Sequence, residues 1–208
     1  MESKRITAAC AAEATVEEKK SVFIGNVSPV SSEEEARAFI DAVKKKYYDA
    51  RHNVFAYYLN GGNISRFTDD GEPKGSAGIP VLNVLKMSGA TDMCMVVTRY
   101  FGGILLGTGG LVRAYSAAAK AALDKAGFAV MEMYDLVEVK CSYSDYQKLQ
   151  SQLPKVGAAE ENSAFGADVT MRLSCKKSDT QALCYLVTQL TGARSNAVVT
   201  GEVERKSV

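Results

Sequence analysis

The sequence predicts an α+β protein of two domains, because its apolar pattern and its motif content both change near residue 132. Its 208 residues are enough for one large or two small domains. Residues 133–208 alternate strand-like and helix-like patterns in the order βαββαβ, which is the plan of a ferredoxin-like domain. The glycine-rich and acidic motifs all lie before that point. We therefore expect domains at 1–132 and 133–208.

Composition is that of a globular protein, with 47% hydrophobic and 24% charged residues. The formal net charge is +1, with 16 basic and 15 acidic residues through Glu132 and nine of each after it. Neither half is a basic module, so contact with nucleic acid requires a local patch. Five scattered cysteines and one histidine argue against a zinc site. No apolar run has the length of a signal-peptide core or a membrane span, so we expect a cytoplasmic protein.

The first domain begins with a strand pattern over 14–30 that contains a turn or solvated edge at 17–20. Ser32 and Glu35 then form a capping box for a helix. Further elements follow in order: strands 54–59 and 64–68 joined as a hairpin, a helix at 80–87, a strand at 93–97, and a helix from Gly110 to a stop at Gly127. The second domain reads as strands 136–141, 156–165, 169–173 and 197–203 with helices 143–153 and 179–190.

The most informative stretch is 97–115, VTRYFGGILLGTGGLVRAY, in which two glycine clusters join a strand to a helix. N–H groups at a helix start favour anions, and no Asp or Glu occurs from Met93 to Leu123. A phosphate or nucleic-acid site is therefore predicted at Arg99, Tyr100, Gly102, Gly103, Gly107, Thr108, Gly109, Gly110 and Arg113. A purely structural role for the glycines is the alternative. The Walker pattern fails at Thr108 and Gly109, and the dinucleotide pattern fails at Val112.

An acidic motif precedes this stretch in the loop 66–80, where Arg66, Asp69, Asp70, Glu72 and Lys74 are close together. Clustered carboxylates can hold Mg²⁺ or Ca²⁺, or act as general acid and base. They can also cap the helix at 80–87. A third interpretation pairs them with Arg99 or Arg113, which would fix the glycine turn. We favour this ordering role over metal binding, and we predict no cofactor.

His52 is the other residue singled out by its chemistry. It is the single histidine of the chain, and no carboxylate lies beside it at a spacing that indicates a catalytic pair. We interpret it as structural rather than catalytic.

The motif blocks together resemble the YigZ/IMPACT family. The resemblance is carried by His52-Asn53 with Ala56-Tyr57, by Asp69 to Pro73 with Gly75 to Pro80, and by Val96 to Tyr115. It spans roughly 15–125, whereas the part after 132 resembles the second domain of the bacterial branch in length and pattern only. The resemblance implies an N-terminal α/β domain like that of a ribosomal small-subunit protein and the GHMP kinases, with a left-handed βαβ crossover. It also implies a ferredoxin-like C-terminal domain similar to a domain of elongation factor G.

The resemblance also directs the functional expectation. Eukaryotic members of the family act in translational control by competing for an activator of a stress-responsive kinase, through an additional N-terminal domain that has no counterpart in this sequence. For bacterial members the family implies association with nucleic acid or the ribosome and no established reaction. We therefore expect a noncatalytic, translation-linked regulator that binds RNA or the ribosome, with a translation factor or regulatory protein as a further partner.

In this interpretation Arg99 and Arg113 contact phosphates, while Tyr100, Phe101 and Tyr115 stack on bases. Core packing is the alternative for the aromatic residues, and we favour it more for Phe101 than for Tyr100. A different function is an enzyme or binder acting on a phosphorylated small molecule. There the glycine loop holds phosphate, and Asp69, Asp70 and Glu72 hold a metal. A protein-interaction module is the third possibility.

Overall fold

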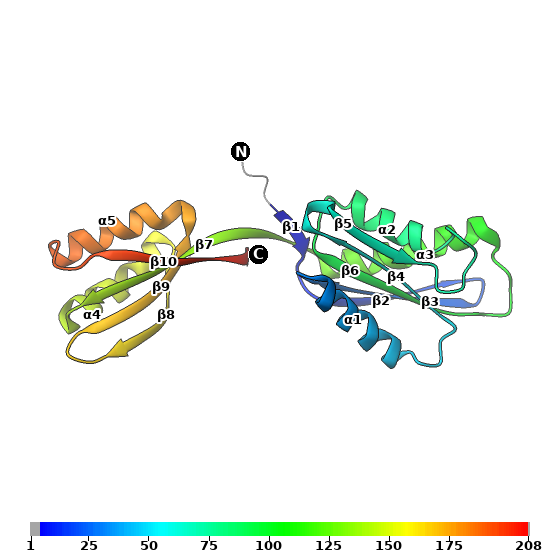
Figure 1. Ribbon diagram of the computed structural model, residues 1–208, viewed down its shortest axis with the longest axis horizontal. Coiled ribbons are helices and arrows are strands. Elements are labelled where there is room, and N and C mark those ends of the chain that lie inside the picture. The colour runs from blue at the N-terminus through cyan, green and yellow to red at the C-terminus, as the bar shows by residue number, and fades with distance from the viewer. Residues whose placement is uncertain (1–4, 208) are drawn as a thin grey trace. The chain divides into compact units, whose positions relative to one another are not determined.

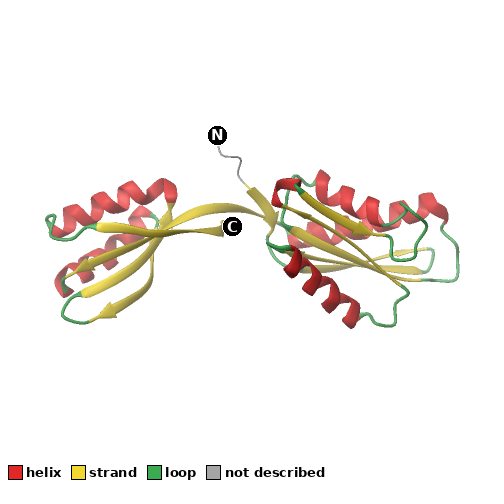
Figure 2. Cartoon of the chain, viewed as in Figure 1, coloured by secondary structure: helices red, strands yellow, loops and turns green. Residues whose placement is uncertain are grey.

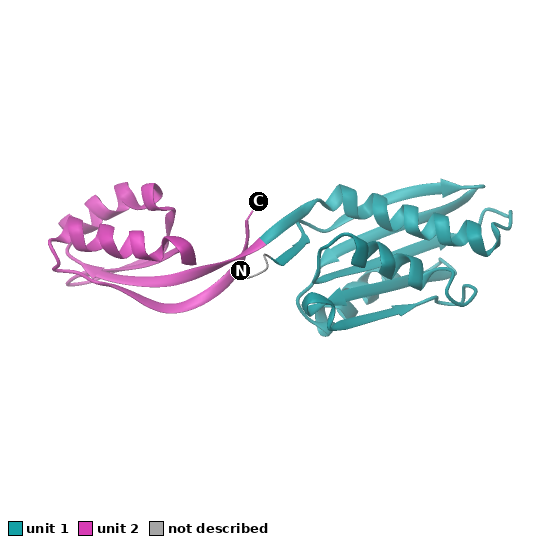
Figure 3. Cartoon of the chain, turned by 90° about the horizontal axis from the view of Figure 1, so that it is seen from above, with its two compact units in different colours: residues 1–130, 208 teal, residues 131–207 magenta. Residues whose placement is uncertain are grey.

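A computed structural model describes residues 5–207. Residues 1–4, which belong to the N-terminal stretch considered for a signal peptide, and Val208 lie outside the described residues. The chain forms two compact units, one extending to Val130 and the other spanning Met131–Ser207 (Figure 3). Each has its own hydrophobic core, and the fold is of the mixed α+β, two-domain class that the sequence predicts.

The first unit is built on a five-stranded sheet in the order β2-β3-β6-β4-β5 (Figure 1). Its strands are β2 (Ala12–Glu18), β3 (Ser21–Pro29), β4 (His52–Leu59), β5 (Ile64–Thr68) and β6 (Met93–Tyr100). Each neighbouring pair is antiparallel. Because β3 and β4 both run opposite to the central β6, they are parallel to each other. Helix α1 (Glu33–Lys46) joins them across β6.

Helices cover both faces of this sheet (Figure 2). Successive side chains of a strand point to opposite faces. Cys94 and Val96 of β6 are in the core on the α1 side. Met93, Met95 and Val97 pack on the other side with α2 (Gly78–Met87) and α3 (Gly107–Ala126). The nearly continuous apolar sequence of β6 is thus explained by burial on two faces.

Local signals place these elements. The Ser32 hydroxyl accepts the Glu35 N–H at 3.1 Å, as the capping box predicts, whereas the Glu35 carboxylate accepts the N–H of Ser31 rather than that of Ser32. Gly25 of β3 lies directly under α3, where a Cβ atom would come within 2.5 Å of the Ala118 carbonyl oxygen. Small residues therefore permit a close approach of helix and sheet.

The second unit has the predicted order of strands and helices. Its elements are β7 (Phe128–Cys141), α4 (Tyr143–Gln152), β8 (Ala158–Phe165), β9 (Val169–Lys176), α5 (Thr180–Thr191) and β10 (Ala197–Ser207). The strands pair in the order β10-β7-β9-β8, which is the arrangement of a ferredoxin-like sheet. Two short 3₁₀ turns, Leu153–Val156 and Lys177–Asp179, precede β8 and α5.

Several boundaries differ from the sequence prediction. Helix α3 begins at Gly107 rather than Gly110, and β7 begins at Phe128 rather than residue 136. Glycine has a low helix propensity, so the sequence pattern does not predict helix at residues 107–109. Tertiary packing nevertheless includes these residues in α3. The pattern does not predict β1 (Arg5–Ala8), whose four residues are too few to show a period; it pairs with β7.

Within residues 5–207, no helix is long and apolar enough to cross a membrane.

Candidate functional site

The motif blocks meet at one end of the first unit's sheet. His52 at the start of β4 is the register partner of Arg99 near the end of β6, and Val22 at the start of β3 is the partner of Tyr100. The acidic loop follows β5, at the same end of the sheet as the start of β4, because β5 is antiparallel to β4. Residues about 50 positions apart in sequence therefore come together at this edge.

An ion pair between Glu72 and Arg99 is the centre of the site. The Arg99 Nη1 atom donates to Glu72 Oε1 at 2.7 Å, and the two side chains are only 7% and 4% exposed. The guanidinium also lies 5.4 Å from the ring centre of Phe23 and 5.5 Å from that of Phe101. Arg99 is therefore a buried structural cation, which corrects the expectation that it presents its charge to phosphates.

Two further side chains contact the same carboxylate. The Tyr115 hydroxyl donates to Glu72 Oε1 at 2.8 Å, and burial together with the Glu72 charge raises the pKa of Tyr115. His52 Nε2 lies 3.9 Å from Glu72 Oε1, while His52 Nδ1 lies 2.7 Å from the Asp70 carbonyl oxygen. Because a carbonyl only accepts, we assign the proton to Nδ1. Tyr115 is fully buried, so it cannot stack on a base.

The carboxylate near His52 could not be found by sequence reasoning. Glu72 follows it by 20 positions, on a loop whose path the sequence does not reveal. Strand pairing and the turn at Asp70, which adopts φ +44°, bring the two side chains together. One weak signal in the sequence links the two residues, because His52 and Glu72 each lie in a stretch of unusual composition beside the end of a predicted strand.

Asp69 and Asp70 hold the loop and the helix that follows it. Asp69 accepts the N–H groups of Gly75 at 2.8 Å, Ala77 at 3.2 Å and Gly78 at 2.8 Å. It thereby caps α2, whose preceding residue provides no side-chain acceptor. Asp70 accepts the Asn53 N–H at 2.6 Å. The capping interpretation is confirmed for Asp69.

The three carboxylates thus point to three different sets of partners. Asp69 is bound to backbone N–H groups, Asp70 to Asn53, and Glu72 to Arg99 and Tyr115. Among the described residues there is no group of three or more His, Cys, Asp or Glu side chains arranged to hold a metal ion. The interpretation in which a carboxylate pairs with Arg99 to fix the loop is confirmed for Glu72. The structure gives no support to a metal at Asp69, Asp70 and Glu72.

The first glycine cluster has a packing role at Gly102. A Cβ atom there would lie 2.0 Å from the Lys20 carbonyl carbon, and the Gly102 N–H donates to Ser21 Oγ at 3.1 Å. Gly103 and Gly107 adopt φ of +85° and +69° with open space around them, so they serve the turn. Gly110 is buried, and a Cβ there would lie 3.0 Å from the Leu106 Cβ. Gly102 and Gly110 are therefore not free ligand-contacting positions.

The start of α3 is different, because it is open. Leu106, which precedes the helix, supplies no capping side chain, and the first turn contains no acidic residue. Gly107, Thr108 and Gly109 are exposed. The exposed Arg113 reaches back toward this turn, since its Nη1 atom lies 3.7 Å from the position of a Cβ at Gly109. Free N–H groups and one cation therefore share this surface.

Apolar side chains of the preceding loop are also exposed. Phe101 is 52% exposed and Leu105 is 83% exposed, which corrects the preference for packing Phe101 in the core. Tyr100 is half-buried, and its hydroxyl donates to Asp49 at 2.6 Å. That bond raises the pKa of Tyr100 to about 12. Residues 101–109 with Arg113 are called the α3-start surface below.

The remaining predicted site residues lie at the exterior. Arg66 is exposed; its Nη1 atom donates to the Ser65 carbonyl, and its Nε atom lies 3.9 Å from a Glu33 oxygen. Lys74 is exposed on the acidic loop. Neither joins the cluster around Glu72.

Comparison with known proteins covers both units. The model of the Impact N-terminal domain matches residues 19–123, and a domain of unknown function, DUF1949, matches residues 139–194. The IMPACT family member YvyE of Bacillus subtilis is 36% identical over 179 residues, which are 86% of this chain and 82% of that protein. The family member YigZ of Escherichia coli is 37% identical over 161 residues, 75% of this chain and 78% of that protein.

A solved structure is similar along nearly the whole chain. It is described as the crystal structure of a hypothetical protein, and it matches with a TM-score of 0.62 and 28% sequence identity. The match covers 97% of this chain and 99% of the other. The two-domain architecture is therefore shared with a solved structure.

Proposed function

Since this chain belongs to the IMPACT family, we propose that it is a noncatalytic, translation-linked protein of the cytoplasm that binds RNA or the ribosome. The proposal places contact on the α3-start surface. A translation factor or regulatory protein is proposed as a further partner.

The observation that carries this proposal is the open start of α3 with Arg113 beside it. Phosphate oxygens accept hydrogen bonds from helix N-terminal N–H groups, and the helix dipole adds to the attraction. A guanidinium provides a further charge-assisted bond to phosphate. Phe101 lies on the same loop with half of its surface exposed, so it can stack on an unpaired base, an interaction worth about 1–3 kcal/mol. The surface thus offers both kinds of contact that single-stranded RNA uses.

The buried cluster supports the noncatalytic part of the proposal. A general acid or base must reach a proton of the substrate, whereas Glu72 and Arg99 are almost completely enclosed and bind each other. Tyr115 is enclosed with them. The hydrogen bonds of Arg99 and Tyr115 to Glu72 give these buried polar groups a structural role in the fold. The alternative is a metal-dependent reaction on a phosphorylated small molecule. It requires carboxylates that can bind the metal, whereas Asp69, Asp70 and Glu72 are bound to other groups of the protein.

The test is RNA binding by Arg113→Gln, with Arg37→Gln as the matched control. Arg37 is exposed on α1, which packs against the opposite face of the sheet. We expect Arg113→Gln to weaken binding of short single-stranded RNA about tenfold, the loss of one charge-assisted contact, and Arg37→Gln to leave it unchanged. Binding is measured by fluorescence anisotropy at fixed salt.

Equal affinities for the wild type and both variants would remove the α3-start surface from the proposal. Failure of the wild type to bind either RNA or ribosomal subunits would remove the proposed function itself. A shift of the melting temperature by a magnesium–nucleotide complex would instead favour the small-molecule alternative.

A further inference from the structure

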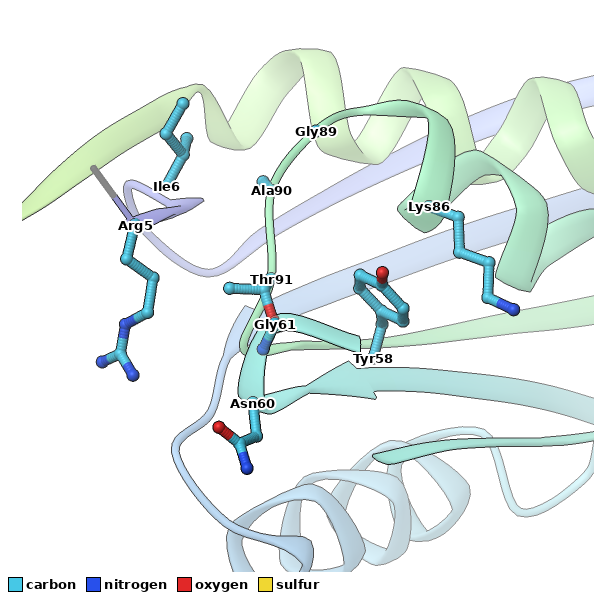
Figure 4. Close-up of a pocket in the computed structure, with 9 residues that line it drawn as sticks. All are labelled: Arg5, Ile6, Tyr58, Asn60, Gly61, Lys86, Gly89, Ala90 and Thr91. Carbon is cyan, nitrogen blue, oxygen red and sulfur yellow. The ribbon is translucent and has the colours of Figure 1, made fainter. Parts of the chain in front are cut away.

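The first unit contains a cavity of about 430 Å³ that the proposed function does not use. Its walls come from β1, from the end of β4 and the 3₁₀ turn Asn60–Gly62, and from the end of α2 with the turn before β6 (Figure 4). It lies at the end of β4 that is opposite to His52, and so it is separate from the α3-start surface. Its volume is in the range of small-molecule sites, about 300–1,000 Å³.

The charge of the lining is positive. Lys86 and Arg5 line the cavity, and the described residues around it include no Asp or Glu. The nearest carboxylate, Asp92, is buried and already committed: one oxygen accepts the Asn60 N–H at 2.8 Å, and the other lies 3.3 Å from Arg5 Nε. Arg5 is therefore partly neutralised. In the described chain Lys86 has no carboxylate partner, and its ammonium lies 5.9 Å from the ring centre of Tyr58.

The polar side chains around Lys86 can act as donors. The Tyr58 hydroxyl and the Asn60 side-chain amide make no hydrogen bond within the described chain, and both residues line the cavity. The carbonyl end of α2 also faces this region, and its negative dipole would oppose an anion. Its last carbonyls are, however, satisfied by the N–H and hydroxyl groups of Ser88. The Lys86 ammonium and the Tyr58 hydroxyl therefore remain as donors on one side of the cavity, whereas the Asn60 amide points away from them (Figure 4).

The walls are held in place by specific bonds. The Gly61 N–H donates to Thr91 Oγ1 at 3.0 Å, the Thr91 N–H to the Ile6 carbonyl at 2.7 Å, and the Asp92 N–H to the Tyr58 carbonyl at 2.8 Å. These bonds hold Asn60 at φ +52° and Asp92 at φ +58°, a left-handed conformation that asparagine and aspartate adopt more readily than other non-glycine residues. The cavity is thus preorganised.

We propose that this cavity binds a small organic anion, a phosphate ester or a carboxylate, with Lys86 as the main charged contact and the Tyr58 hydroxyl as a hydrogen-bond donor. The site is independent of the RNA-binding proposal, because none of its residues belongs to the α3-start surface.

The proposal is tested by NMR titration of the full chain at constant ionic strength. The probes are ribose 5-phosphate, inorganic phosphate and succinate, with ribose as the uncharged control. We expect saturable shifts at the amides of Gly61, Gly89 and Thr91 with the anions and none with ribose. Tighter binding of ribose 5-phosphate assigns the cavity to phosphate esters, and tighter binding of succinate assigns it to carboxylates.

Two variants decide whether the cavity is responsible. Lys86→Gln keeps most of the side-chain stem and removes the charge, so binding should weaken about tenfold. Lys45→Gln, at an exposed position on α1, should bind as the wild type does. Equal affinities in the two variants, or shifts that do not saturate with any anion, would overturn the proposal. Arg113→Gln should leave the titration unchanged, which separates its outcome from that of the RNA experiment.

Discussion

Glu72 is the residue on which the geometry of this edge of the sheet depends most directly, because three side chains from separate elements converge on it. Burying an ion pair costs desolvation energy that the pair recovers only with good geometry and additional hydrogen bonds. Here Tyr115 supplies a hydrogen bond, and the Phe23 and Phe101 rings flank the guanidinium of Arg99. The network joins β6, α3 and the acidic loop into one rigid region.

Tyr115 gives this network a measurable pH dependence. Its pKa is raised by burial and by Glu72, so in the folded protein it keeps its proton above pH 10, where the tyrosine of the unfolded chain ionises. The unfolded state then binds fewer protons, and stability falls as pH rises, by about 1.4 kcal/mol per pH unit for this group. We expect Tyr115→Phe to be about 2 kcal/mol less stable than the wild type at neutral pH, and the difference to shrink above pH 10.

Urea unfolding at several pH values from about 9 to 11 measures this effect. Tyr48→Phe is the control, because that side chain is 85% exposed, and it should follow the wild-type curve throughout. Parallel curves for the wild type and Tyr115→Phe would contradict the assigned role of Tyr115.

At the scale of the elements, the two helices on the same face of the sheet begin in opposite ways. Helix α2 is capped by Asp69 through three N–H groups, whereas α3 begins without a capping side chain. A capped start is stable and closed to ligands, and an uncapped one leaves donors for another molecule. We therefore expect RNA to contact the start of α3 and not that of α2.

The Asp69 cap can be measured separately. Asp69→Ala leaves three N–H groups without their acceptor, and we expect the first unit to lose about 2 kcal/mol, the upper end of the range for caps. Asp69→Asn keeps one acceptor oxygen and should lose about half as much. Denaturation followed by circular dichroism gives both values. Asp41→Ala, at an exposed position of α1, is the matched control, and a loss no larger than in this control would refute the capping role.

At the scale of the whole molecule, a net charge of +1 limits how nucleic acid can be bound. Each phosphate neutralised by a cation contributes about −0.7 to the slope of log K against log salt for single strands. The α3-start surface presents one cation, Arg113, with Lys20 on the adjoining turn packed against Gly102. Binding must therefore combine few ionic contacts with stacking and backbone N–H groups.

This predicts a shallow salt dependence. For one or two phosphate contacts we expect a slope of about −1 for single-stranded RNA, and a slope closer to zero for Arg113→Gln. Anisotropy titrations across a range of salt concentrations provide the measurement. A steep slope, such as about −5, would show that a larger cationic surface binds RNA and would contradict the assignment to α3.

Most of the fold follows from local patterns along the chain. The capping box at Ser32, the hairpin around residues 60–63 and the βαββαβ pattern each depend on neighbours within a few positions, so local spacing is sufficient to predict them. Family membership could also be recognised, because the motif blocks are long and contiguous. The ordering role of the acidic loop was among the alternatives, since carboxylates and arginines without nearby partners must be satisfied somewhere in the fold.

Which side chains meet and which remain exposed depends on long-range packing. Arg99 is two positions from the exposed Phe101, and Tyr115 is two positions from the exposed Arg113, yet β6 and α3 turn them inward onto Glu72. Phe101 lies past the end of the strand, so it stays half outside. His52 acquired a carboxylate neighbour, and the cavity beside Lys86 arose from three segments that no local pattern links. Such contacts depend on strand register and on how helices pack against the sheet, and these are properties of long-range packing rather than of spacing along the chain.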